Sequence, residues 1–231
     1  MKSRLAKSRI LEFLGRDMGE VHPIQNLKEV LPDLAIFGGM IRDLTLGGTE
    51  SFRSDIDLVS TASAEEILHF IGGYSPVRNR FGGFRFFFLG RPYDIWSLHD
   101  TWAVREGYVQ ASSIEDLSKT TFFTVDAALF NVRSELFYAP DFCRKSIEGR
   151  MLDINLIYNP FPQKMAMKAV DLSIRKRLKM SYRLCEFVLS NGVFEGRNTF
   201  YFECLLSHVK NSVGRDFEFS KQLTLDFSVQ D

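Results

Sequence analysis

Two aspartates one residue apart, Asp55 and Asp57, can supply a pair of carboxylates to a single reaction site. The apolar residues around them predict a β-strand over residues 55–60, and alternate side chains of a strand face the same way. Two carboxylates on one face repel each other unless a cation lies between them. Mg²⁺ suits that position, because it takes oxygen ligands and is commonly shared with substrate phosphates. The pair therefore predicts a Mg²⁺ site for phosphate chemistry.

A third carboxylate, Asp94, lies in another predicted strand at residues 93–98. Three carboxylates can hold two metal ions about 4 Å apart, which activate an attacking oxygen and stabilise a leaving pyrophosphate. We therefore predict that Asp55, Asp57 and Asp94 are the catalytic and metal-binding residues.

Two glycines, Gly38 and Gly39, end a buried run that predicts a strand at residues 34–37. Residues 40–46 after them predict a helix. Glycines allow a backbone to approach phosphates closely, so this turn is a candidate site for the phosphates of a nucleotide.

The pattern of the remaining elements predicts an α+β fold, with a mixed or antiparallel sheet and flanking helices. Apolar periodicity predicts helices at residues 8–14, 27–31 and 64–70, the last opened by a capping box at Ser63 and Glu66. A further strand is expected at residues 84–89, joined to the Asp94 strand by a turn at residues 90–92. Residues 121–132 are apolar and fit either a strand or a helix.

Two regions are expected, a head domain at residues 1–155 and a mainly helical region at residues 156–231. In the second, residues 165–189 have helical periodicity, with an apolar face and a basic face. The basic face contains Lys168, Arg175, Lys179 and Arg183. Such a face could steer an RNA backbone or hold a triphosphate. Alternatively it is a solvated surface with local ion pairs such as Asp171 with Arg175.

Composition excludes several classes of protein. The net charge of +0 and the pI of about 6.9 give no global electrostatic argument for nucleic-acid binding. The three cysteines, Cys143, Cys185 and Cys204, are far apart and odd in number, and their spacing fits neither a disulfide framework nor a zinc site. No segment approaches the roughly 20 apolar residues of a membrane span. We expect a soluble, cytoplasmic protein that makes no membrane contact.

This ordered set of residues resembles the head domain of bacterial tRNA nucleotidyltransferases (CCA-adding enzymes) and poly(A) polymerases, in the polymerase-beta nucleotidyltransferase superfamily. The resemblance covers residues 1–130. It lies in Gly-Gly-x-x-Arg-Asp at residues 38–43, Asp-x-Asp at 55–57, an acidic residue on a later strand, and Phe-Gly-Gly at 81–83, where the family has Phe-Gly-Thr.

The resemblance implies a role for each matched residue. Gly38 and Gly39 would line the triphosphate, and the carboxylates already named would bind Mg²⁺. Arg42 would contact phosphate, and Asp43 would brace the helix, so these four are the predicted nucleotide-binding residues. The implied partners are a nucleoside triphosphate such as ATP and an RNA acceptor.

The sequence departs from the family at two motifs. Where the family has Arg-Arg-Asp-Phe-Thr-x-Asn-Ala, residues 120–127 read Thr-Thr-Phe-Phe-Thr-Val-Asp-Ala, so the contacts to the nucleotide sugar are replaced. The Glu-Asp-x-x-Arg motif that reads C and A is replaced near residues 159–164. Synthesis of a CCA end is therefore not predicted.

We expect metal-dependent transfer of a nucleoside monophosphate from a nucleoside triphosphate to an acceptor hydroxyl, in the first place an RNA 3′ end. Nucleotidylation of a protein or small molecule, and a nucleotide-binding module without turnover, are the alternatives.

Overall fold

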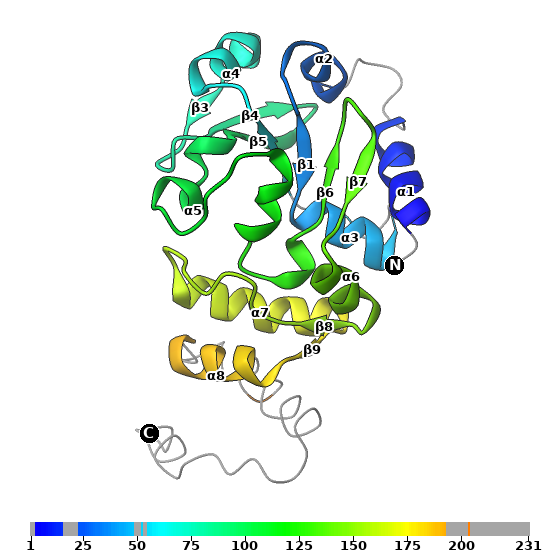
Figure 1. Ribbon diagram of the computed structural model, residues 1–231, viewed down its shortest axis with the longest axis vertical. Coiled ribbons are helices and arrows are strands. Elements are labelled where there is room, and N and C mark those ends of the chain that lie inside the picture. Colours follow the sequence, from blue (N-terminus) through cyan, green and yellow to red (C-terminus); the bar gives the residue numbers. More distant parts are fainter. Residues whose placement is uncertain (1–2, 16–22, 49–51, 53–54, 193–202, 204–231) are drawn as a thin grey trace. The chain divides into compact units, whose positions relative to one another are not determined.

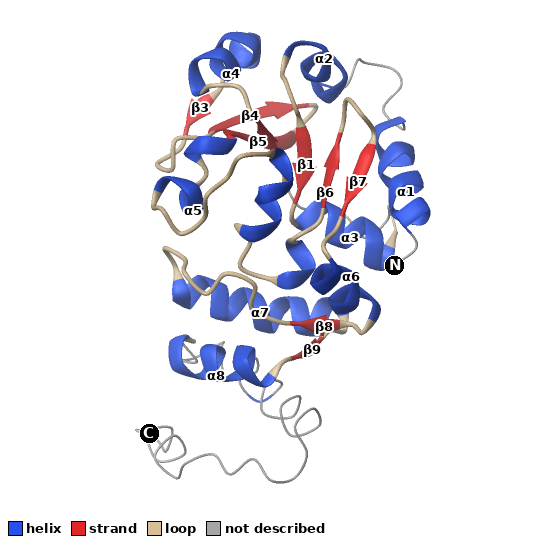
Figure 2. Cartoon of the chain, in the orientation of Figure 1, coloured by secondary structure: helices blue, strands red, loops and turns tan. Residues whose placement is uncertain are grey.

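The computed structural model describes residues 3–15, 23–48, 52, 55–192 and 203 (Figures 1 and 2). The chain divides into two compact units, residues 1–161 and 162–231. From residue 193 onward only Glu203 is described, so much of the predicted helical region lies outside the described residues.

The first unit contains a seven-stranded sheet with the strand order β3-β4-β5-β2-β1-β6-β7 (Figure 2). The strands are β1 (Ala35–Phe37), β2 (Ile56–Ser60), β3 (Val77–Arg78), β4 (Phe84–Phe88), β5 (Arg91–Ser97), β6 (Leu129–Asn131) and β7 (Leu136–Tyr138). β2 and β5 pair in parallel and the other neighbours pair antiparallel. The predicted α+β fold with a mixed sheet is confirmed.

Helices flank this sheet (Figure 1). The α-helices are α1 (Ser3–Gly15), α2 (Pro23–Val30), α3 (Gly39–Gly47), α4 (Ala64–Ile71), α5 (Trp102–Arg105) and α6 (Asp141–Glu148). Short 3₁₀-helices are η2 (Gly72–Tyr74), η3 (Leu98–Asp100), η4 (Ile114–Lys119) and η5 (Thr124–Asp126). A short strand, β8 (Met151–Leu152), follows α6. The predicted capping box of α4 is present, because Ser63 and Glu66 each bond the other's backbone N–H.

Apolar side chains cover both faces of the sheet. On one face, a row of side chains runs across five strands and is almost completely buried. It consists of Phe84, Ile95, Leu58, Ile36 and Phe130. On the other face a second buried cluster consists of Ala35, Val59, Leu98, Ile114, Leu117 and Leu129. Because both faces of the sheet are mostly apolar and buried, polar side chains on the second face are candidates for function.

Two details differ from the sequence-based expectations. The β4–β5 turn is at Leu89 and Gly90, which both have positive φ (50° and 74°), and not at residues 90–92. Two positive φ values match the type I′ turn that two-residue hairpins favour. Residues 121–132 form neither one strand nor one helix, since they divide into η5 and β6.

The second unit contains α7 (Pro162–Lys176), β9 (Lys179–Met180) and α8 (Tyr182–Asn191). The prediction of continuous helix over residues 165–189 is therefore wrong. Arg177 adopts a left-handed conformation with φ 52°, and Ser181 caps a new helix by accepting a hydrogen bond from the Leu184 N–H at 3.1 Å.

This break divides the predicted basic face between three elements. Lys168 and Arg175 lie on α7, Lys179 on β9 and Arg183 on α8. Arg175 pairs with Asp171 at 2.6 Å, as the solvated-surface alternative predicted. Among the helices of the described residues, none combines the length and apolar character needed to cross a bilayer.

Candidate active site

Strand pairing brings two of the predicted carboxylates together. β2 and β5 run parallel, and their register sets Asp57 directly opposite Asp94. Residues opposite each other on neighbouring strands share a face, with their strands about 4.8 Å apart. Asp55 comes immediately before β2, and strand alternation gives it the same face as Asp57.

The next residue in this row is Arg85, which lies opposite Asp94 on β4. Its Nε donates to Asp94 Oδ1 at 2.8 Å, and its Nη2 donates both to Asp94 Oδ2 and, at 2.6 Å, to Asp55 Oδ2. One guanidinium thus links two of the three carboxylates. The hydrogen bond to Asp94, together with the charges of Asp94 and Asp55, raises the pKa of Arg85 above its ordinary value.

The glycine turn lies beside the same row of side chains. Gly38 has φ 72° and ψ −134°, a conformation that glycine adopts far more readily than other residues, and a Cβ at this position would lie 3.8 Å from Asp57 Oδ2. Gly39 is the first residue of α3. Backbone N–H groups at a helix N-terminus attract anions, so the turn and the carboxylates border one site.

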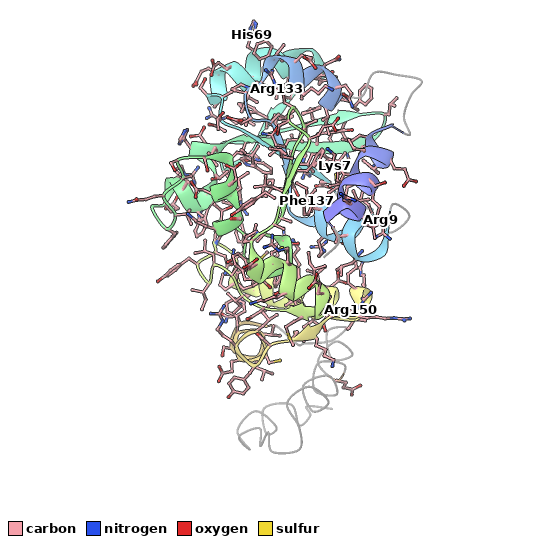
Figure 3. The ribbon with its side chains drawn as sticks, turned by 45° about the vertical axis from the view of Figure 1, so that its right-hand side comes forward. Lys7, Arg9, His69, Arg133, Phe137 and Arg150 are labelled. Atoms are coloured by element: carbon pink, nitrogen blue, oxygen red, sulfur yellow. The ribbon has the colours of Figure 1, made fainter. Side chains whose placement is uncertain are left out.

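The far end of α3 is held by α1. Arg9, labelled in Figure 3, donates from Nη1 to the carbonyl oxygens of Leu44 and Thr45, both at 3.0 Å. These carbonyls belong to the last turn of α3, where cations are favoured. α1 therefore helps to fix the direction in which the N-terminus of α3 points.

Arg42 and Asp43 lie one turn into α3 and are both buried. Arg42 donates from Nε to Asp43 Oδ1 at 2.8 Å and from Nη1 to Asp126 Oδ1 at 2.7 Å. Burial alone would lower the pKa of Arg42, but the charges and hydrogen bonds of the two aspartates outweigh it and raise the pKa. Two carboxylates thus hold the guanidinium of Arg42, and its contact with a phosphate stays a prediction.

An aromatic pocket opens on the face that bears the carboxylates. Phe37 directly precedes Gly38, and Trp96 lies two residues beyond Asp94 on the same face of β5. The cavity has a volume of about 200 Å³ and is lined by Phe37, Phe81, Trp96, Thr101, Trp102, Ala103 and Thr120. Planar aromatic walls of this kind suit the flat face of a ring system.

Gly83 allows the indole of Trp96 to lie in this position. A Cβ at residue 83 would come within 2.1 Å of Trp96 Nε1. The pocket also contains Thr120, the first residue of the segment that replaces the family's Arg-Arg-Asp, and the hydroxyl of Thr120 donates to the Leu117 carbonyl at 2.8 Å.

Sequence reasoning missed the roles of Arg85 and Asp126. Arg85 follows the Phe-Gly-Gly at residues 81–83, and the two-residue turn at Leu89 and Gly90 would have paired it with Asp94 had the turn been placed there. Asp126 gave no local signal, since its partner Arg42 is 84 residues away.

The chemistry of the donor set fits Mg²⁺, because all three predicted ligands offer carboxylate oxygens. With Arg85 between Asp55 and Asp94, however, the described residues contain no group of three or more His, Cys, Asp or Glu side chains arranged to hold a metal ion. A metal ion at this site would therefore compete with the guanidinium of Arg85 for the carboxylates.

No protein-family sequence profile matches the chain, and no curated protein matches it in sequence. Solved structures do match. A tRNA nucleotidyltransferase complexed with a primer tRNA and an incoming ATP analogue shares 17% identity over 87% of this chain and 65% of its own, with a TM-score of 0.55.

Two further solved structures are similar to this chain in fold. The Bacillus stearothermophilus CCA-adding enzyme in complex with CTP shares 20% identity over 84% of this chain and 48% of its own, with a TM-score of 0.56. Another CCA-adding enzyme with CTP shares 15% identity over 94% of this chain and 52% of its own, with a TM-score of 0.55. The present chain thus spans about half to two thirds of the length of these proteins. The chain thus has the fold seen in these structures of tRNA nucleotidyltransferases and CCA-adding enzymes.

Proposed function

We propose that this protein transfers a nucleoside monophosphate from a nucleoside triphosphate to an acceptor hydroxyl. The observation that carries the proposal is the row formed by Asp94 and Asp57 on neighbouring strands, which ends beside the Gly38 turn. Carboxylates next to a glycine turn at a helix N-terminus suit metal-dependent phosphoryl transfer.

The chain's own groups would divide the work as follows. The turn at Gly38 and Gly39 would hold the triphosphate through the backbone N–H groups at the start of α3. Asp55, Asp57 and Asp94 would hold Mg²⁺. When bound there, Mg²⁺ supplies Lewis acidity that favours loss of the acceptor proton and neutralises charge on the leaving group.

In the transfer, the acceptor oxygen forms a bond to the α-phosphorus as the bond from that phosphorus to the bridging oxygen of pyrophosphate breaks. The acceptor hydroxyl loses its proton to solvent water, and pyrophosphate leaves with the electron pair of the broken bond. Catalysis of this kind depends on positioning and charge more than on a protein nucleophile, so rigid strands are suitable supports for the carboxylates.

The aromatic pocket would receive the base of the nucleotide. It begins next to both the glycine turn and Asp94, because Phe37 precedes Gly38 and Trp96 follows Asp94 by two residues. Stacking of a base on an aromatic side chain stabilises binding by roughly 1–3 kcal/mol and tolerates different bases. This mode of binding agrees with the absence of the family's base-reading motif from the sequence.

For the acceptor we favour an RNA 3′ end. The support is the likeness of fold to a tRNA nucleotidyltransferase that was solved with a primer tRNA and an ATP analogue. The basic surface offers less support than the sequence suggested, since it is divided between α7, β9 and α8 and Arg175 pairs with Asp171.

A second candidate is a nucleotide-binding module without turnover. The observation in its favour is Arg85, which pairs with Asp55 and Asp94 and so relieves the repulsion that would otherwise demand a metal ion. In that case the protein would bind a triphosphate at the glycine turn and release it unchanged.

Transfer of label distinguishes these candidates. The protein would be incubated with each α-³²P-labelled nucleoside triphosphate, Mg²⁺ and a pool of small RNAs, and RNA and protein would be resolved on gels. We expect label on RNA 3′ ends with the wild type and none with Asp57→Asn. Label on protein would support the alternative acceptor, and tight nucleotide binding without label anywhere would support the non-catalytic module.

A further inference from the structure

We propose that Arg85 is a resident counter-ion of the carboxylate site and couples metal binding to triphosphate binding. In the ligand-free protein its guanidinium pairs with Asp55 and Asp94, and divalent cations must displace it. The triphosphate then gives the guanidinium a new partner. This inference rests on the proposed function and adds a regulated order of binding to it.

The contacts of the Arg85 guanidinium carry the first step. Arg85 Nη2 reaches both Asp55 Oδ2, at 2.6 Å, and Asp94 Oδ2, while Nε donates to Asp94 Oδ1 at 2.8 Å. Both oxygens of Asp94 are thus engaged by one cation. A divalent ion that takes oxygen ligands needs these same atoms, so the guanidinium and the ion exclude each other at Asp94.

Solvent exposure makes the displacement feasible. The Arg85 side chain is 45% exposed, whereas that of Asp94 is 8% exposed. A long arginine side chain at the surface can leave its position without unfolding the sheet, while the buried carboxylate stays. Asp94 left alone would be a buried, unpaired charge, which is costly, so release of Arg85 requires a cation to take its place.

The row of side chains across the sheet carries the second step. Arg85, Asp94 and Asp57 occupy β4, β5 and β2 in register, and Gly38 borders Asp57. β4 is two strand spacings, roughly 10 Å, from β2. A triphosphate bound at the glycine turn would lie along this row, and the planar guanidinium fork is well suited to phosphate oxygens.

Coupling between the two ligands follows from these steps. The ligand-free protein binds divalent cations weakly, because each must compete with Arg85. A bound triphosphate draws the guanidinium away and so strengthens cation binding, and by linkage the cation strengthens triphosphate binding by the same factor. Removal of the guanidinium should therefore raise metal affinity in the absence of nucleotide and reduce the coupling between the two ligands.

Binding of Mn²⁺ to the full-length protein, measured by electron paramagnetic resonance, tests this without reference to turnover. We expect Arg85→Met to bind Mn²⁺ at least about tenfold more tightly than the wild type in the absence of nucleotide, a difference of about 1.4 kcal/mol. The gain should disappear in the double variant Arg85→Met, Asp57→Asn. A non-hydrolysable ATP analogue should tighten Mn²⁺ binding by a larger factor in the wild type than in Arg85→Met.

Arg78→Met is the matched control. Arg78 lies on the adjacent strand β3 opposite Phe84, on the other face of the sheet from Arg85, with its guanidinium 5.7 Å from the Phe84 ring. We expect its Mn²⁺ affinity to equal that of the wild type. Arg85→Gln provides a second neutral variant, and circular dichroism would verify that each variant is folded.

The outcomes separate the two proposals. Equal Mn²⁺ affinity in the wild type and both Arg85 variants, lost in Asp57→Asn, would overturn the role of Arg85 and leave the proposed function standing. Failure of the wild type and of both Arg85 variants to bind Mn²⁺, with or without the ATP analogue, would overturn the metal-dependent function and the role of Arg85 with it.

Discussion

Asp126 Oδ1 accepts a hydrogen bond from Arg42 Nη1 at 2.7 Å, and this buried ion pair joins α3 to η5. Because α3 begins at the glycine turn, the pair holds the helix whose N-terminus would face the triphosphate. The same guanidinium also pairs with Asp43, whose Oδ1 lies 2.8 Å from Arg42 Nε. We therefore assign Asp126 a positioning role in the proposed site.

Replacement of Asp126 by alanine should destabilise the protein. It leaves a buried guanidinium with one carboxylate in place of two, and loss of one partner from a buried pair costs about 3 kcal/mol or more. Chemical denaturation would measure the change in the free energy of unfolding. Lys7→Ala, which removes the exposed pair of Lys7 (Figure 3) with Glu135, serves as control and should cost less than about 1 kcal/mol. Equal effects of the two changes would contradict the role of Asp126.

Gly38→Ala should weaken nucleotide binding. The backbone of Gly38 has φ 72° and ψ −134°, and a side chain there would be strained and would point toward Asp57. Backbone strain of this kind costs on the order of 1–3 kcal/mol. If the turn moves to relieve the strain, this corresponds to a loss of affinity of about 5- to 150-fold. Titration with a fluorescent ATP analogue would measure it.

The control for that titration is Gly72→Ala, because Gly72 has a helical conformation and open space around the position of a Cβ. We expect its affinity for the analogue to match that of the wild type. Unchanged affinity in Gly38→Ala would show that the turn does not hold the nucleotide.

Nucleotide binding should change the intrinsic fluorescence of the protein. The chain has 2 tryptophans, and both Trp96 and Trp102 line the aromatic pocket. A base stacked in the pocket would quench them, whereas inorganic tripolyphosphate, which has no base, should leave the signal unchanged. The measurement is a fluorescence titration corrected for nucleotide absorbance. Saturating nucleotide without any change in emission would exclude the pocket as the base site.

Two cysteines should resist alkylation in the folded protein. Burial raises the pKa of Cys143 to about 12 and that of Cys185 to about 11. Since the thiolate is the reactive form, only about one Cys185 in a thousand is ionised at pH 8. Iodoacetamide labelling followed by peptide mass spectrometry should find both unmodified at pH 8 and modified in denaturant. Rapid labelling of either one in the native protein would be inconsistent with its burial.

Local patterns in the sequence predicted the elements that position the site. The strand at β2, the turn at Gly38 and the capping box at Ser63 follow from alternation, glycine and hydrogen-bonding side chains, all of which act over a few residues. The order of the motifs along the chain led us to expect Asp57 and Asp94 close together. The parallel pairing of β2 with β5 explains how they come to lie opposite each other.

What the sequence could not supply depended on contacts between distant segments. The Arg42–Asp126 pair spans 84 residues, and the contact of Arg85 with Asp55 spans 30. The prediction of a continuous helix over residues 165–189 was wrong for a different reason. α7 ends where Arg177 adopts a left-handed conformation, and no glycine or proline marks this position in the sequence.

Release of pyrophosphate tests the central claim most directly. The wild type would be assayed with each nucleoside triphosphate, Mg²⁺ and an RNA pool, beside Asp57→Asn and the control Asp171→Asn. The control alters a pair on α7 between the half-buried Asp171 and the exposed Arg175. Changes to groups that merely support metal ligands cost 10–100-fold in activity or affinity, so loss of a ligand itself should cost at least about a hundredfold. We predict Mg²⁺-dependent release by the wild type and by Asp171→Asn, and its near abolition in Asp57→Asn. Equal rates of release in the wild type and Asp57→Asn would contradict the assignment of this carboxylate site to nucleotidyl transfer.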